Sequence, residues 1–244
     1  MQEGAIRDTV RRATQRLLRR APSVARLSRL LQYAFHRTTA VVEQVPARAA
    51  LACAPGCAFC CSHPVDITPP EAFAIVAALR TMRPAAAGET LAGRIARQAD
   101  RIRGLSYAEH AQARLPCALL VEGQCAVYPW RPFACRAWTS TSAARCASTY
   151  SHGDPVTRLP PLDMPTYKTV WEIAHGVTDG LMQRRLDGTS YELHSIVQRV
   201  LDTPEAAPRW LRGEAVFTGC TVGAFSASCH PRRGRRPPRP PGRS

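Results

Sequence analysis

Eight of the ten cysteines are spaced so that they could bind metal together. The first four lie in the stretch C-A-P-G-C-A-F-C-C, at Cys53, Cys57, Cys60 and Cys61. The second four follow at wider intervals, at Cys117, Cys125, Cys135 and Cys146. Thiolates are good ligands for zinc and iron, and the Cys57-x2-Cys60 spacing lets two sulfurs face one ion. The pattern predicts that all eight sulfurs are metal ligands.

The number of sulfurs indicates one or two metal sites. Eight thiolates would fill two four-sulfur sites, or one such site with extra thiols beside it. Zinc and iron–sulfur clusters both accept all-cysteine ligand sets, so the spacing predicts zinc or iron without choosing between them. Neighbouring side chains of an extended chain point to opposite sides. This favours Cys60 and Cys61 serving different ions or a bridged pair.

Three further side chains lie close to the cysteines in sequence. His63 could replace a sulfur, although a histidine in a loop is more often solvated. Arg131 and Arg136 flank Cys135. They could lower the cost of holding several thiolates together, or they could pair with an acid elsewhere.

The remaining cysteines and histidines indicate no catalytic site. Cys220 and Cys229 stand near the basic C-terminal end without matching partners, and we expect free thiols there. The other histidines are scattered, and no motif pairs one of them with a nucleophile. The sequence therefore leaves open whether the protein is an enzyme.

Helices are predicted on the N-terminal side of the cysteines. Apolar residues recur at helical spacing over residues 5–45 with arginines on the other faces, and Pro22-Ser23 marks a break. We favour a packing helix with a solvated basic face here over a helix lying on an anionic membrane or a segment like an organellar transit peptide. Thr68-Pro69-Pro70-Glu71 predicts the capped start of a buried helix.

The second cysteine group is predicted to lie on short elements. Helices over residues 88–103 and 106–114 precede it, and residues 118–128 have the pattern of a β-hairpin whose arms carry Cys117 and Cys125. A short helix is expected to begin near Cys135. Residues 139–165 are rich in Ser, Thr and Pro and are predicted to form an irregular loop containing Cys146.

The last third is predicted to be helical again. One apolar stripe runs from Tyr167 to Leu181, Thr189-x-x-Glu192 has the form of a capping box, and a short helix is expected around Trp210. The fold class is therefore mainly α with a small β-hairpin, with an irregular cysteine-rich metal-binding core packed on helices.

Four regions are predicted along the chain. Residues 1–45 form an Arg-rich helical segment, and residues 46–150 form the cysteine-cluster metal-binding domain. Residues 151–230 are a helical part that packs on that domain. Residues 231–244 are almost wholly Arg, Pro and Gly and are expected to be a disordered tail.

The formal net charge of +15 is concentrated at the ends. Residues 1–37 hold nine arginines and two acids, and residues 231–244 hold six arginines and no acid. The residues between them are nearly neutral and produce little long-range field. Solvated arginines explain this pattern, so nucleic-acid binding through the ends is left open but not favoured.

The hydropathy pattern gives an expected location. No run of about 18 uncharged apolar residues is present, so no transmembrane helix is expected. Arginines interrupt every apolar stretch up to Arg37, unlike the apolar region of a signal peptide. We therefore expect a cytoplasmic protein, in which a reducing environment favours metal ligation over disulfides.

The cysteine segments resemble a known family. C-A-P-G-C-A-F-C-C, then P-C-A-L-L-V-E-G-Q-C-A-V-Y-P-W-R-P-F-A-C-R, then Cys146 are similar to the YkgJ-like cysteine-cluster (CxxCxxCC) family, described as zinc- or iron-chelating. The resemblance covers roughly residues 50–150 and is most specific from Cys125 to Arg136. The first gap has three residues here, whereas the family pattern has two.

The resemblance implies metal chelation and two further hypotheses. Members are often labelled iron–sulfur oxidoreductases, and flagellin lysine methylases carry a similar cluster. A cluster-dependent enzyme, either an oxidoreductase or a protein-methylase-like enzyme, is therefore one alternative. The absence of a G-x-G-x-x-G loop weighs against methyl transfer. A zinc-dependent nucleic-acid-binding protein is the other alternative.

Overall fold

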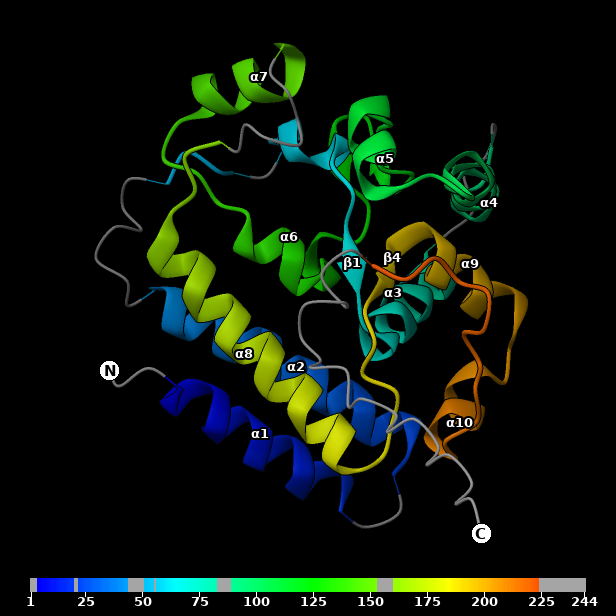
Figure 1. The fold of residues 1–244 in the computed structure, drawn as a ribbon. Coiled ribbons are helices and arrows are strands. Elements are labelled where there is room, and N and C mark those ends of the chain that lie inside the picture. The colour runs from blue at the N-terminus through cyan, green and yellow to red at the C-terminus, as the bar shows by residue number, and fades with distance from the viewer. Residues whose placement is uncertain are drawn as a thin grey trace, which may run out of the picture.

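The computed structural model describes residues 4–19, 22–43, 51–54, 56–82, 89–152 and 160–223 (Figure 1). The α-helices are α1 (Ala5–Leu18), α2 (Val24–Glu43), α3 (Pro69–Thr81), α4 (Leu91–Ile102), α5 (Tyr107–Ala113), α6 (Phe133–Ala137), α7 (Ala143–His152), α8 (Met164–Gln183), α9 (Leu193–Asp202) and α10 (Ala206–Leu211). Two short 3-10 helices are η2 (Phe59–Ser62) and η3 (Tyr128–Trp130).

Strands make up only two short antiparallel pairs within these ranges. The predicted hairpin is formed by β2 (Leu120–Val121) and β3 (Gln124–Cys125). Its turn residues Glu122 and Gly123 both have positive φ, as a type I′ hairpin turn requires. The second pair joins β1 (Asp66–Ile67) to β4 (Tyr191–Glu192) and was not predicted. The mainly α fold class is confirmed.

The N-terminal arginine-rich segment forms two packed helices. The predicted break at Pro22-Ser23 is confirmed, because α1 ends at Leu18, α2 begins at Val24 and the Ser23 hydroxyl accepts a hydrogen bond from the Arg26 N–H at 3.4 Å. The apolar faces of both helices are buried. Together with α8, these helices form one layer of the molecule (Figure 1).

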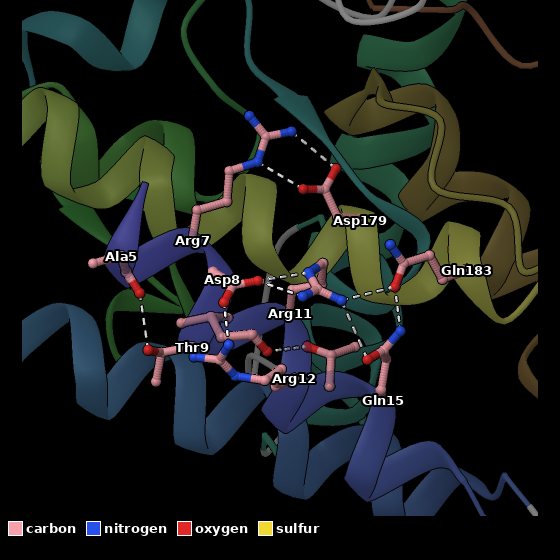
Figure 2. Close-up of polar contacts among 11 residues, drawn as sticks. Ala5, Arg7, Asp8, Thr9, Arg11, Arg12, Gln15, Asp179 and Gln183 are labelled. Atoms are coloured by element: carbon pink, nitrogen blue, oxygen red, sulfur yellow. Dashed lines mark hydrogen bonds and ion pairs between the residues drawn. The ribbon is translucent and has the colours of Figure 1, made fainter. Parts of the chain in front are cut away.

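The contact between α1 and α8 is unusually close because α8 has glycines there. A Cβ on Gly176 would lie 2.5 Å from the Arg7 carbonyl oxygen, and one on Gly180 would lie 2.5 Å from the Thr14 side chain. At the same interface the Arg7 guanidinium pairs with the Asp179 carboxylate at 2.6 Å (Figure 2). The two helices are thus packed backbone to backbone.

The C-terminal helices share a hydrophobic core with the segment that carries the cysteines. β1 pairs with β4, α3 packs on α9, and α6 packs on α8. Trp210 of α10 is fully buried against Phe73 of α3, with ring centroids 5.7 Å apart. Figure 1 shows α3, α9 and α10 gathered on the side away from α1.

Two local predictions were wrong. Residues 143–152 form helix α7, not part of a loop, because Ser142 begins a helix and its carbonyl accepts from the Cys146 N–H at 3.1 Å. The capping box at Thr189 is also absent. Glu192 itself caps α9 by accepting from the Ser195 N–H at 2.8 Å, since Glu192 is held in β4.

Some expectations concern other parts of the chain. The tail 231–244 and Cys229 lie outside the described residues. Among the helices that the structure describes, none is long and apolar enough to cross a membrane.

Candidate metal centre

Cys53 and Cys57 lie on a turn that is attached to the second cysteine region. The Cys57 N–H donates to the Ala54 carbonyl at 3.0 Å, and Gly56 has φ +90° within this turn. The Ser140 N–H donates to the Cys53 sulfur at 3.3 Å. The Ser140 carbonyl also accepts from the Ala52 N–H at 2.9 Å. Backbone contacts therefore fix Cys53 beside residue 140.

Cys60 and Cys61 lie in the 3-10 helix η2 and not in an extended chain. A hydrogen bond with the Cys61 thiol and burial together raise the pKa of Cys60 well above its usual value. The expectation that these two side chains point to opposite sides is therefore wrong. Tight 3-10 winding replaces the alternation of an extended strand.

The second cysteine group approaches the first through a direct backbone contact. The Cys117 N–H donates to the Cys61 carbonyl at 2.7 Å. Cys125 lies in β3, directly after the hairpin turn, and Cys135 lies in α6. Cys146 lies in α7, which packs against η2.

The thiols fall into two neighbouring sets that share Cys60. Burial raises the pKa of Cys53, and so do the nearby sulfurs of Cys57, Cys60 and Cys146. Nearby sulfurs also raise the pKa of Cys135, and they are Cys60, Cys117 and Cys125. All nine described cysteines are free thiols. The two distant cysteine segments therefore meet in space.

Burial makes isolated thiolates costly at this place. Cys135 is half-buried, and burial is the main reason why its pKa lies well above the usual value. Burial also raises the pKa of Cys125 and Cys146. A bound cation is what would stabilise several thiolates here, because a metal ion deprotonates the thiols that coordinate it.

The two arginines beside Cys135 have different surroundings. The pKa values of Cys60, Cys125 and Cys135 are raised, and the positive charge of Arg131 partly opposes that rise. Arg136 donates to the carbonyls of Arg131 at 2.8 Å and Pro129 at 2.7 Å. Neither arginine forms an ion pair with an acid in the described residues.

His63 is buried, so the expected solvated side chain is wrong. It is 8% exposed, its Nε2 lies 2.7 Å from the Tyr107 hydroxyl, and its ring stacks near Trp138. Within the described residues, the buried Nδ1 has no hydrogen-bond partner. Together with Cys60 and Cys135, His63 lines a cavity of about 30 Å³. Such a volume has room for an ion or one or two waters.

Two buried carboxylates, which the sequence indicated only as helix caps, hold the cysteine segments. Glu71, at the start of α3, accepts hydrogen bonds from the Thr68 N–H at 2.8 Å and from the Phe133 N–H at 2.9 Å. It thereby fixes the first residue of α6, the helix of Cys135. The predicted capping box explains the first bond. No local pattern indicates the second.

Glu192 acts in a similar way through a histidine. One Glu192 oxygen lies 2.8 Å from His194 Nδ1, and His194 Nε2 accepts from the Ala118 N–H at 3.1 Å. Because Nε2 is an acceptor, the imidazole proton lies on Nδ1 and points to the carboxylate. The Glu192–His194 pair thus fixes the backbone directly after Cys117.

The donor set fits zinc or iron, although the thiols are not arranged as a closed site. Soft sulfur donors, one buried imidazole nitrogen and a small cavity meet at one place. Among the described residues, no three His, Cys, Asp or Glu side chains lie close enough to hold one ion. Ligation at about 2.3 Å would require the thiols to turn toward a common point.

The comparisons with known proteins agree with the cysteine pattern. No curated protein and no solved structure matches the chain. A family model does match, and it covers the segment in which all eight cysteines lie. Residues 52–152 match the CxxCxxCC family, whose description reads "Putative zinc- or iron-chelating domain".

Proposed function

We propose that the protein binds zinc or iron through eight cysteines arranged as two four-sulfur sites. The observation that carries the proposal is the meeting of the two cysteine segments, joined by the hydrogen bond from the Cys117 N–H to the Cys61 carbonyl at 2.7 Å. Eight reduced thiols that converge in this way could all coordinate metal ions, and the ions would then cross-link the two segments. Reduced thiols also suit a reducing compartment such as the cytoplasm.

The proposed ligand sets follow the two groups of neighbouring sulfurs. Cys53, Cys57 and Cys146 form one set. Cys117, Cys125 and Cys135 form the other. Cys60 and Cys61 complete them, one in each set or as a bridged pair, because their thiols are in contact and Cys60 neighbours both groups.

The protein supplies positions and the metal supplies Lewis acidity and cross-linking. Ser140 holds Cys53, Glu71 holds the helix of Cys135, and the Glu192–His194 pair holds the backbone after Cys117. Structural zinc contributes on the order of 10 kcal/mol of apparent binding energy, coupled to folding. This is comparable to the whole stability of a domain, so metal binding and folding of residues 52–152 should be linked.

The test is metal analysis of anaerobically purified protein. We expect about two equivalents of zinc or iron per chain. The Cys57→Ser/Cys146→Ser and Cys125→Ser/Cys135→Ser variants should each lose about one equivalent, in separate sites. Cys220→Ser is the matched control, because Cys220 is a buried free thiol beside Ser195, and it should keep the full content. Less than about half an equivalent of any transition metal in the wild type would refute the proposal.

A cluster-dependent enzyme is the second candidate, and the cavity beside Cys60 and Cys135 is the observation in its favour. Trp138 and Trp171 form part of its wall, so an ion or a water molecule there would lie beside the sulfurs. Absorbance in the visible that dithionite bleaches would support an iron–sulfur cluster and this role. A colourless protein with stoichiometric zinc would exclude the redox version.

A further inference from the structure

A basic groove lies at the end of the α1–α8 layer, away from the cysteines. Two hollows of about 410 and 380 Å³ adjoin there, because Arg16 and Arg19 line both. Six arginines from α1, α2, α8 and their ends form the lining, and they are Arg12, Arg16, Arg19, Arg26, Arg29 and Arg184. Among the residues that the structure describes, the other lining residues are Gln or Leu, and none is acidic.

Part of this positive charge is not neutralised within the protein. Arg12 pairs with Asp8, and Arg184 donates to the Arg19 carbonyl at 3.4 Å. In the ranges that the structure describes, Arg16, Arg19 and Arg29 form no ion pair with a carboxylate. Placing several guanidinium groups around one concave surface costs free energy through mutual repulsion, which an anionic ligand would remove.

The groove is built on a rigid support. The close glycine contacts and the Arg7–Asp179 pair hold α1 on α8. Figure 2 shows Gln15 of α1 and Gln183 of α8 meeting across this interface, and both residues line the groove. Arginines on a fixed surface lose less conformational entropy on binding than arginines on a flexible tail.

The lining indicates which anion would bind. Guanidinium groups recognise phosphate oxygens with two parallel hydrogen bonds. Two adjoining hollows extend beyond a single phosphate and suit a row of phosphates. No aromatic side chain of the described part of the chain lines them, so bases would not stack there as they do on single-strand-binding surfaces. The apolar face of α1 is used against the core, where Val10 and Leu18 are fully buried, so α1 has no apolar face left to insert into a membrane.

We propose that the basic groove binds the phosphate backbone of a nucleic-acid duplex without reading its sequence. The site is the folded surface made by α1, α2 and α8 and not the arginine-rich C-terminal end. It shares no residue with the proposed metal centre. Failure of one proposal therefore leaves the other standing.

The test is fluorescence anisotropy with labelled DNA and RNA duplexes of about 20 base pairs and mixed sequence. The variant is Arg16→Glu/Arg19→Glu. The matched control is Arg80→Glu/Arg101→Glu, which changes the net charge equally at exposed arginines of α3 and α4. We expect the groove variant to lose at least about tenfold in affinity and the control less than about threefold. In a plot of log K against the logarithm of the salt concentration, the slope should be about −4 to −5 for the wild type. For the groove variant its magnitude should be lower by about 2.

Several results would overturn the proposal. One is an equal loss of duplex affinity in the groove variant and in the control. A second is binding that disappears when residues 231–244 are deleted but persists in Arg16→Glu/Arg19→Glu. A third is binding to vesicles containing phosphatidylserine without binding to either duplex. Arg16→Gln/Arg19→Gln provides a milder variant if the charge reversal unfolds the protein, and it should lose affinity in the same direction. Unchanged metal content and thermal unfolding in the variants would exclude an indirect effect.

Discussion

Replacing Gly180 by Ala should destabilise the protein, although alanine is the better helix former. Gly180 lies in the interior of α8, where alanine is favoured over glycine by about 1 kcal/mol. The added Cβ, however, would lie 2.5 Å from two carbon atoms of Thr14 and 3.1 Å from the Arg11 carbonyl oxygen. Optimal contacts between carbon atoms are about 3.5–4.0 Å, so α1 would have to move away from α8.

The expected magnitude follows from these opposing terms. Overpacking a tight interior costs about 1–3 kcal/mol, and the upper end applies because Thr14 is completely buried and its own hydroxyl donates to the Val10 carbonyl at 3.0 Å. Subtracting the gain in helix propensity leaves a net loss of about 2 kcal/mol in the free energy of unfolding. Gly176→Ala should cost at least as much, since its Cβ would meet the backbone oxygen of Arg7 at 2.5 Å.

Gly93 of α4 provides the matched control. The nearest atoms to a Cβ there would be in the side chains of Glu89 and Thr90, at 3.3 Å or more. Gly93→Ala should therefore stabilise the protein by about 0.5–1 kcal/mol. Urea denaturation of the metal-loaded variants, with the slope compared as well as the midpoint, measures both changes. Stabilisation by both substitutions would refute the close α1–α8 contact, and with it the rigid support of the basic groove.

Three further outcomes test the centre and the core. Excess chelator should lower the thermal unfolding temperature of the wild type and of Cys220→Ser, and it should lower that of Cys125→Ser/Cys135→Ser by less, because this variant keeps only the ion of the other site; differential scanning fluorimetry measures this. Glu71→Ala should cost about 2–4 kcal/mol in urea denaturation, because buried N–H groups including that of Phe133 lose their acceptor, whereas Glu71→Gln should cost less. Burial, then Arg7, lowers the pKa of His175, so the unfolded state binds more protons below about pH 6.5 and stability should fall on acidification. His175→Gln should flatten that pH profile, and an unchanged slope would contradict the reasoning.

Features that depend on neighbouring residues could be predicted from the sequence. The break at Pro22-Ser23 and the capped start at Thr68 rest on backbone preferences of a few adjacent residues, and both are observed. The hairpin turn at Glu122-Gly123 belongs to the same class. Helix α7 was missed because the Ser- and Thr-rich composition was given more weight than Ser142 as a helix start.

Features that depend on distant residues could not be predicted. The β1–β4 pair has only two residues in each strand, too few for an alternating pattern to be visible. Its presence moved the cap of α9 from Thr189 to Glu192. His63 is buried because Tyr107 and Trp138 close over it, and nothing near His63 in the sequence indicates these partners.

The candidate metal centre also combines features that the sequence predicted with features that depend on distant residues. The spacing of the thiols indicated that they converge, but it could not give their grouping, which depends on where α6 and α7 are packed. The mistaken view of Cys60 and Cys61 came from assuming an extended backbone, and side-chain direction depends on backbone winding. Local sequence therefore identified the donors, and tertiary packing determined which donors are neighbours.

Helix α8 connects the two proposed sites without belonging wholly to either. Trp171, in its first half, lines the cavity beside Cys60 and Cys135, whereas Gly180 and Gln183, near its end, support α1 and the basic groove. The helical rise from Trp171 to Gln183 is about 18 Å, so the two sites lie at separate parts of one element. The contacts that build the groove involve glycine, arginine, threonine, glutamine and aspartate residues, and among the described residues none involves sulfur. Metal binding should consequently govern the order of the cysteine segments, and the groove should depend on the α1–α8 contact.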